Sequence, residues 1–123
     1  MLGCAPALAP RGLENVPPAI ASDDFVTRDG LHLPLRHWDA KNPKAIIVAL
    51  HGMSDYSNAF SIPAPMLADH GISVLAYDQR SFGRAPNPGV WPGSEAMRGD
   101  LDDFVDIVRA ERPRIALIAL RQS

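Results

Sequence analysis

The chain lacks the features that mark several large classes of protein. Its 123 residues include one cysteine, Cys4, so no disulfide can form within it. No apolar run approaches the roughly 20 residues of a membrane-spanning helix. A net charge of −2 provides neither a basic field for nucleic acid nor a polybasic anchor for anionic lipid. The 46% of apolar and 21% of charged residues fit one small globular domain, and we expect no nucleic acid among its partners.

Motifs for phosphate and metal binding are missing as well. No Gly-x-Gly-x-x-Gly follows a predicted strand and no Gly-x4-Gly-Lys occurs, so a nucleotide or dinucleotide would lack its usual phosphate-binding loop. His51 and Asp55 lie close together in the sequence, but no second histidine cluster accompanies them. We therefore expect neither a cofactor nor a metal.

Residues 1–22 form a proline- and alanine-rich segment, which predicts a flexible, extended leader. The opening Met1-Leu2-Gly3-Cys4 resembles the end of a bacterial lipoprotein signal, although the charged and apolar regions of such a signal are absent. Two interpretations stay open. Either the small residues are a chance start of a cytoplasmic protein, or the start codon is assigned too late and Cys4 is the lipid anchor of a membrane-bound lipoprotein.

Residues 23–123 alternate apolar strands with helices. Asp29-Gly30 predicts a hairpin turn, and Pro34 places this hairpin at a sheet edge, because proline cannot donate to a strand ladder. Strands are then expected at residues 45–50, 73–77 and 115–120, with helices at 62–70 and from Ser94 to just before Pro113. This order predicts an α/β fold with an N-terminal β-hairpin followed by a parallel βαβαβ unit, in three α/β/α layers.

The second predicted helix is amphipathic. Its apolar stripe consists of Met97, Leu101, Phe104, Val105 and Val108. Four acids, Asp100, Asp102, Asp103 and Asp106, lie mostly off that stripe. We expect them to form a solvated face.

The carboxyl ends of parallel strands are where ligands bind in open α/β sheets. His51-Gly52-Met53 follows the strand at 45–50 directly. This turn resembles the oxyanion loop of the α/β-hydrolases, which implies that the Met53 amide would point at the negative oxygen that develops in acyl transfer. Gly52 would let the backbone approach that oxygen closely. We expect His51 to shape this loop through a side-chain hydrogen bond.

A second loop strengthens that interpretation. Tyr77-Asp78-Gln79-Arg80-Ser81-Phe82-Gly83 resembles the Tyr-Asp-x-Arg-Gly-x-Gly loop of the serine aminopeptidase-like branch of the α/β-hydrolases, which includes monoacylglycerol lipases and lysophospholipases. The continuation to Gly93 is similar to bacterial members, and the resemblance covers roughly residues 25–120. Asp78, Arg80 and Gly83 are expected to pin the turn. Ser81 stands where the family usually has glycine, which would cost of order 1 kcal/mol if the position needs a positive φ.

The resemblance also implies a nucleophile elbow, Gly-x-Ser-x-Gly, after the strand at 115–120. Counting from Arg112-Pro113 puts Ser123 at the nucleophile, but Arg121 replaces the first glycine, and a frayed terminal serine is the competing interpretation. The acid and histidine of the triad come after the serine in this fold. None of the four histidines present, His32, His37, His51 and His70, is expected to act as the base.

The resemblance therefore implies part of a serine hydrolase for carboxylic esters, with acylglycerol or lysophospholipid as the substrate. We expect this chain to be inactive, because its sheet is truncated at the nucleophile elbow. Two alternatives stay open: a non-catalytic fragment or half-domain that needs a partner chain, and another chemistry on the same fold, such as a dehalogenase with an aspartate nucleophile. The strand at 115–120 would be an open apolar edge, so we expect self-association.

Overall fold

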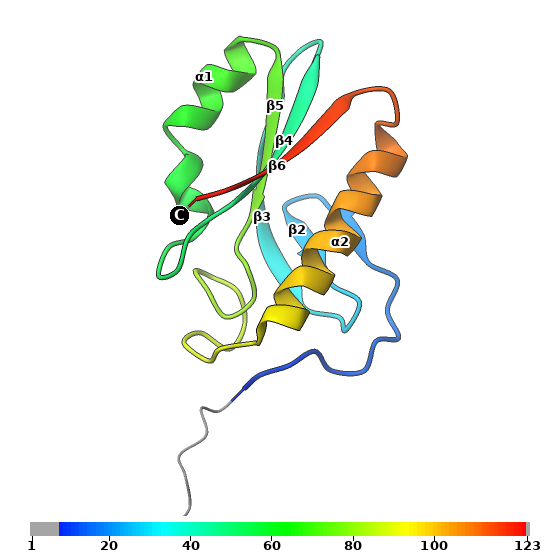
Figure 1. The fold of residues 1–123 in the computed structure, drawn as a ribbon, viewed down its shortest axis with the longest axis vertical. Coiled ribbons are helices and arrows are strands. Elements are labelled where there is room, and N and C mark those ends of the chain that lie inside the picture. The colour runs from blue at the N-terminus through cyan, green and yellow to red at the C-terminus, as the bar shows by residue number, and fades with distance from the viewer. Residues whose placement is uncertain (1–7, 123) are drawn as a thin grey trace, which may run out of the picture.

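A twisted six-stranded sheet organises the chain (Figure 1). The computed structural model describes residues 8–122, so the predictions for Cys4 and Ser123 lie outside the described residues. The strands are β1 (Ala19–Ala21), β2 (Asp24–Val26), β3 (His32–Trp38), β4 (Ala45–Leu50), β5 (Ile72–Tyr77) and β6 (Ala116–Arg121). The helices are the 3-10 turn η1 (Ser57–Phe60), α1 (Pro63–Asp69) and α2 (Ser94–Glu111).

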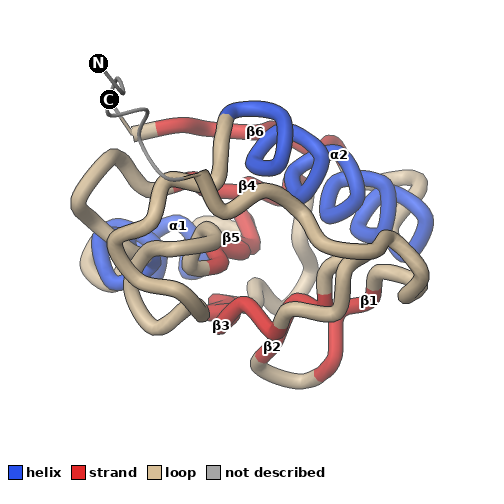
Figure 2. Tube along the Cα trace, turned by 90° about the horizontal axis from the view of Figure 1, so that it is seen from below, coloured by secondary structure: helices blue, strands red, loops and turns tan. Residues whose placement is uncertain are grey.

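The parallel half of the sheet has the predicted arrangement. The strand order is β1-β2-β3-β5-β4-β6, and β4 pairs in parallel with both β5 and β6. Figure 2 shows α1 and α2 on opposite faces of the sheet, so the three-layer α/β/α arrangement is confirmed. β4 lies centrally because both of its faces are apolar and both are covered, as in other parallel sheets. No helix in the described residues has the length and apolarity needed to cross a bilayer.

The main core lies between the sheet and α2. Its centre is a trio of buried rings, Phe25, Tyr77 and Phe104, whose centroids are 4.9 to 5.1 Å apart. Tilted and edge-to-face ring pairs of this kind are more favourable than stacked sandwiches. The trio joins β2, β5 and α2. A smaller cluster of alanines and valine lies under α1.

The hairpin of β2 and β3 does not form a sheet edge, contrary to the expectation from Pro34. β3 is internal, since it pairs with β2 on one side and β5 on the other. Proline is tolerated because the ladder between β3 and β5 begins one residue later, at Leu35. On the side that faces the end of β5, Pro34 contributes only its carbonyl oxygen, which accepts from the backbone N–H of Asp78 at 2.8 Å.

The sheet edge is instead β1, in residues predicted to belong to the leader. Ala19 pairs with Val26 in an antiparallel ladder, and Ile20 packs against the main core. Residues 19–21, which the sequence analysis assigns to the leader, therefore form a strand of the sheet. One apolar side chain on the covered face and a free β2 edge are sufficient to recruit this short strand.

The opposite edge, β6, is poorly covered. Its side chains are mostly exposed, and 51% of the surface of Ile118 and 49% of that of Leu120 are accessible to solvent. Only Leu117 packs against the α2 side of the core, together with Ile115 just before the strand. The prediction of an open apolar edge at this strand is confirmed within residues 8–122.

Candidate active site

The loop after β4, residues 51–55, is called the oxyanion loop here, and it lies at the same rim of the sheet as the end of β6. Leu50 is in register with Arg121, and the backbone N–H of Gln122 donates to the Leu50 carbonyl at 2.9 Å. The side-chain oxygen of Gln122 accepts from the Gly52 amide at 3.2 Å. The oxyanion loop and the residue before Ser123 are therefore joined directly by hydrogen bonds.

Met53 stands outward on this loop. Its residue surface is 66% exposed. Within residues 8–122 its backbone N–H donates to no acceptor. The next residue, Ser54, has a positive φ of 64°, which turns the chain sharply away from the rim. An amide without an internal partner, held at the carboxyl end of a parallel strand, is available to an incoming oxygen.

His51 is buried behind the loop, with 2% of its surface exposed. The backbone N–H of Gln79 donates to its Nε2 at 2.9 Å, and its Nδ1 lies 2.9 Å from the Gly52 carbonyl oxygen. An amide can only donate, so Nε2 is the acceptor and the proton sits on Nδ1. Both ring nitrogens are thus engaged, and His51 has no nitrogen left to act as a base.

Asp78 ties the loop after β5 to the chain beyond the oxyanion loop. Its carboxylate accepts from the backbone N–H of Ser57 at 2.8 Å and from that of Arg84 at 3.0 Å. Gly83 reaches this position with a φ of +54°, where its α-carbon passes close to the Asp78 carboxylate. These contacts fit the pinning role that the sequence predicts for Asp78 and Gly83.

Arg80 anchors the loop after β5 through buried ion pairs. Its guanidinium donates to both carboxylate oxygens of Asp29 at 2.8 and 2.9 Å, and to both of Asp100 at 2.7 and 2.9 Å. All three side chains are at most 4% exposed. Paired bidentate contacts satisfy the buried charges and join the β2–β3 turn, the β5–α2 loop and α2.

The solvated face predicted for the acids of α2 is wrong for two of the four. Asp100 is buried against Arg80, and Asp103 accepts from Arg28 and Arg11 at 2.8 Å each. Buried side chains on α2 recur every four residues, at Ala96, Asp100, Phe104 and Val108. Asp100 lies on the same face of the helix as Phe104 and Val108. This position was the sequence signal that Asp100 is buried and paired with a cation.

Arg11 makes a structural contact that the sequence did not indicate. Its side chain donates to Asp100 at 3.1 Å, to Asp103 at 2.8 Å and to Glu14 at 2.8 Å. This brings the segment before β1 onto α2, 89 residues further along the chain. No local pattern predicts a partner at that separation.

The ion pairs lower the pKa of two carboxylates. Burial alone would raise the pKa of Asp29, but hydrogen bonds from Arg80, Thr27 and the Gly12 amide outweigh it and hold that pKa well below its usual range. Hydrogen bonding from Arg28, and then from Arg11, lowers the pKa of Asp103 despite partial burial. Both groups are charged in the folded protein at neutral pH.

Acid is therefore expected to weaken the fold. A carboxylate whose folded pKa is depressed stabilises the protein fully above its unfolded pKa, near ~3.9, and this contribution is lost as the pH falls towards the folded value. Urea unfolding should show a falling free energy from about pH 5 to about pH 2. The Asp29→Asn variant should be less stable than the parent at neutral pH, and its free energy of unfolding should fall less over the same pH interval. An equal acid loss in both proteins would contradict the role of Asp29.

Ser81 has a positive φ of 71°, as the resemblance to a glycine position suggested, and is 6% exposed. Ser81→Gly is expected to stabilise the protein by about 0.5–1 kcal/mol, because relief of left-handed strain exceeds the entropy that glycine loses on folding. Thermal unfolding would measure the gain. Ser81→Ala keeps the strain and should show no gain, so equal melting temperatures for both variants would contradict the explanation.

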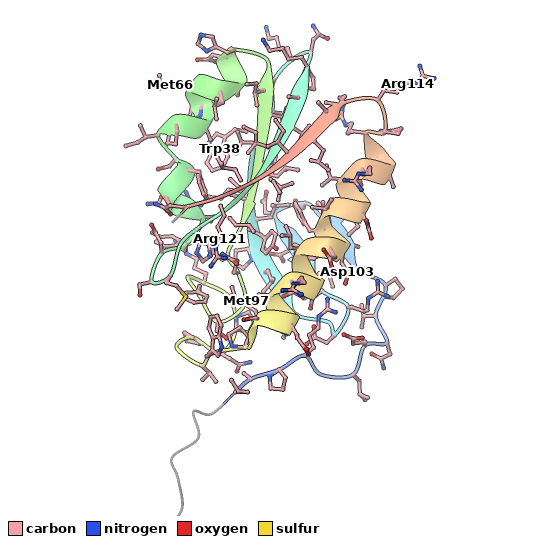
Figure 3. The ribbon with its side chains drawn as sticks, in the orientation of Figure 1. Trp38, Met66, Met97, Asp103, Arg114 and Arg121 are labelled. Carbon is pink, nitrogen blue, oxygen red and sulfur yellow. The ribbon has the colours of Figure 1, made fainter. Side chains whose placement is uncertain are left out.

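A cleft of about 400 Å³ opens between α2 and the end of β6. Its walls are mainly apolar, from Leu50, Trp91, Met97, Leu101, Ala119 and Leu120, with Gln79, Ser94, Arg98 and Arg121 among them. Figure 3 shows Met97 on α2 and Arg121 at the end of β6. The cleft adjoins the rim that carries the oxyanion loop.

The other histidines lie away from this rim. Nδ1 of His70 is 2.7 Å from the Met66 carbonyl at the end of α1, and His32 and His37 contact acids on the exposed surface of β3. Within residues 8–122, no three His, Cys, Asp or Glu side chains are grouped as metal ligands would be.

The fold and the loops at this rim of the sheet together define the class of protein. A hairpin leads into a parallel sheet with helices on both faces, and a strand-ending His-Gly loop faces the end of the next parallel strand. This is the N-terminal part of the α/β-hydrolase fold.

Comparison with known proteins identifies the family. The family model for serine aminopeptidase, S33, matches residues 41–123, and the chain belongs to that family. The chain is 34% identical over 62 residues to a serine hydrolase-like protein of Dictyostelium discoideum, covering 50% of this chain and 17% of that protein. It is 37% identical over 81 residues to epoxide hydrolase A of Mycobacterium tuberculosis, covering 63% of this chain and 25% of that protein.

Among solved structures, the fold is similar to that of a monoglyceride lipase from Saccharomyces cerevisiae, with a TM-score of 0.68 and 24% identity. The match covers 77% of this chain and 33% of the lipase. The chain thus spans about a third of that structure and about a quarter or less of the two curated relatives.

Proposed function

We propose that this chain supplies the oxyanion loop and the nucleophile strand of a serine hydrolase for carboxylic esters. The observation that carries the proposal is the convergence of the loop that contains Met53 and the end of β6 on one rim, joined through the contact of Gln122 with the Gly52 amide. Membership of the serine aminopeptidase family supports a hydrolase. The resemblance of the loop after β5 to that of monoacylglycerol lipases and lysophospholipases favours acylglycerol or lysophospholipid among the esters.

In the proposed reaction the hydroxyl of Ser123 attacks the ester carbonyl and gives its proton to a histidine. The carbonyl oxygen becomes an oxyanion and accepts from the Met53 amide. Collapse expels the alcohol, leaving an acyl-enzyme that water resolves. The acid and histidine follow the nucleophile in this fold, so residues after Ser123 would have to provide them.

The test compares two substitutions at Met53, made in a form of the protein that includes the acid and histidine. Met53→Pro removes the amide proton and should lower kcat for p-nitrophenyl esters by about 10²–10³-fold. Met53→Ala keeps the amide and serves as the control, since the exposed side chain has little packing to lose. Equal rates for the two variants, or no ester turnover by the parent, would contradict the proposal.

For the 123-residue chain alone we expect no triad-dependent turnover. A burst of p-nitrophenol that disappears in Ser123→Ala would overturn this expectation.

A second candidate, a non-catalytic half-domain that pairs with another chain, is favoured by the exposed β6 edge. Ile118 and Leu120 are half-exposed on a strand that is paired with β4 on one side only, and its outer edge is a template for strand addition. Sedimentation velocity should show concentration-dependent association that Ile118→Lys reduces. Ile62→Lys, at the N-cap position just before α1, is the matched control, because Ile62 is 80% exposed. A monomer at all concentrations would count against this candidate.

A further inference from the structure

The geometry points to Gln79 as a positioning residue that aims the Met53 amide by clasping His51 behind the oxyanion loop. This inference rests on the proposed function only in assigning an oxyanion to that amide. Gln79 is 9% exposed, and it lies on the loop after β5, beside the cleft. Gln79 occupies the x position of the Tyr-Asp-x-Arg motif, and the motif assigns no role to that position.

Gln79 holds His51 at two points. Its backbone N–H donates to Nε2 of the His51 ring at 2.9 Å. Its side-chain NH₂ donates to the His51 backbone carbonyl at 2.8 Å. One residue therefore fixes both the ring and the main chain of His51, and the edge of the Phe82 ring limits the remaining space, with centroids 5.5 Å apart.

The first contact determines where the imidazole proton sits. Because the Gln79 amide occupies Nε2, the neutral ring carries its proton on Nδ1, facing the Gly52 carbonyl at 2.9 Å. The same carbonyl accepts from the Asp55 backbone N–H at 3.2 Å. Two donors thus hold the Gly52 carbonyl oxygen in one direction.

The direction of that carbonyl sets the direction of the Met53 amide. The Gly52 C=O and the Met53 N–H belong to one planar trans peptide unit, in which they point in opposite directions. Holding the oxygen inward, towards His51, turns the N–H outward. From the other side, Gln122 accepts from the Gly52 amide at 3.2 Å and limits rotation of the preceding unit.

Gln79 thus acts through His51 and touches no reacting atom. Loss of its side chain should loosen the peptide unit of His51 and Gly52, whose carbonyl it holds, and with it the loop that follows. The sheet should stay folded, because the strands on either side keep their ladders. The backbone N–H of Gln79, which selects the tautomer, remains in every substitution except proline.

Nitrogen-15 NMR of the 123-residue chain tests both contacts. In the parent, two-bond correlations of the His51 ring should show the proton on Nδ1, the minor tautomer of an unconstrained histidine side chain. In Gln79→Leu, amide hydrogen exchange at Gly52 and Asp55 should rise about tenfold, the effect of losing one buried hydrogen bond. Exchange at the centre of β4 should stay unchanged.

Ser94→Ala is the matched control, because Ser94 lines the same cleft and makes no contact with His51. It should leave the exchange of the loop amides at the parent value. A proton on Nε2 of His51 would overturn the clasp, and unchanged exchange in Gln79→Leu would overturn the role of the side chain. A uniform rise over the whole chain would also overturn it, as general destabilisation. All of these results are independent of ester turnover, so they stand whether or not the hydrolase proposal fails.

Discussion

Asp100→Ala is expected to lower the free energy of unfolding by about 3–5 kcal/mol, because removing one partner of a buried ion pair leaves a charge without compensation. Asp100 holds Nε and one Nη of Arg80, and it also accepts from Arg11. Its side chain is 2% exposed, so water cannot replace these contacts. Unfolding in urea, followed by circular dichroism, measures the loss.

Asp102→Ala is the matched control two residues further along the same helix. Asp102 is exposed, and a surface substitution of this kind should change stability by less than about 0.5 kcal/mol. Both variants remove one negative charge and introduce the same strong helix former. A similar small effect for Asp100→Ala would mean that the network with Arg80 does not stabilise the fold.

Gly83→Ala has the second large expected effect, a loss of about 2–5 kcal/mol. Part of it is the strain of a left-handed φ of +54°, and part is a collision. A Cβ at this position would lie 2.5 Å from Oδ2 of Asp78 and 2.6 Å from Cβ of Tyr56. Because the Asp78 carboxylate is engaged by two backbone amides, it cannot move aside without breaking them.

Gly89→Ala separates the two contributions. Gly89 also has a positive φ, +81°, but an added Cβ would meet nothing within 4 Å. Its cost should therefore be the strain less the entropy that glycine loses on folding, about 0.5–1 kcal/mol. Thermal or urea unfolding of both variants gives the difference. If Gly83→Ala costs no more than Gly89→Ala, the close packing of the β5–α2 loop against Asp78 is not a constraint.

The parallel part of the sheet was predictable because its signals are local. β4 and β5 are short apolar runs that are buried on both faces and bounded by turn residues. The position of the oxyanion loop follows, since the carboxyl ends of parallel strands share a rim. The predicted boundaries differ from the observed ones by about a residue, as with β6, which is expected at residues 115–120 and observed at Ala116–Arg121.

What the sequence did not predict depends on distant partners. β1 contains one apolar residue, Ile20, among prolines and alanines, and only the free edge of β2 makes it a strand. Arg11 is one of many arginines until α2 presents Asp100 and Asp103 to it. The clasp at His51 likewise needs Gln79, which lies on a different strand end. Such pairs are invisible to periodicity, which reports only neighbours along the chain.

The docking of Arg11 on α2 also has a consequence in time. During synthesis the N-terminal segment leaves the ribosome first, yet its acceptor Asp100 follows 89 residues later. Until then Arg11 has no buried carboxylate to bind, and joining the two ends of so long a loop carries an entropic cost. The segment before β1 is therefore expected to be fastened after the sheet and α2 have assembled, and to be the first part released when the protein begins to open.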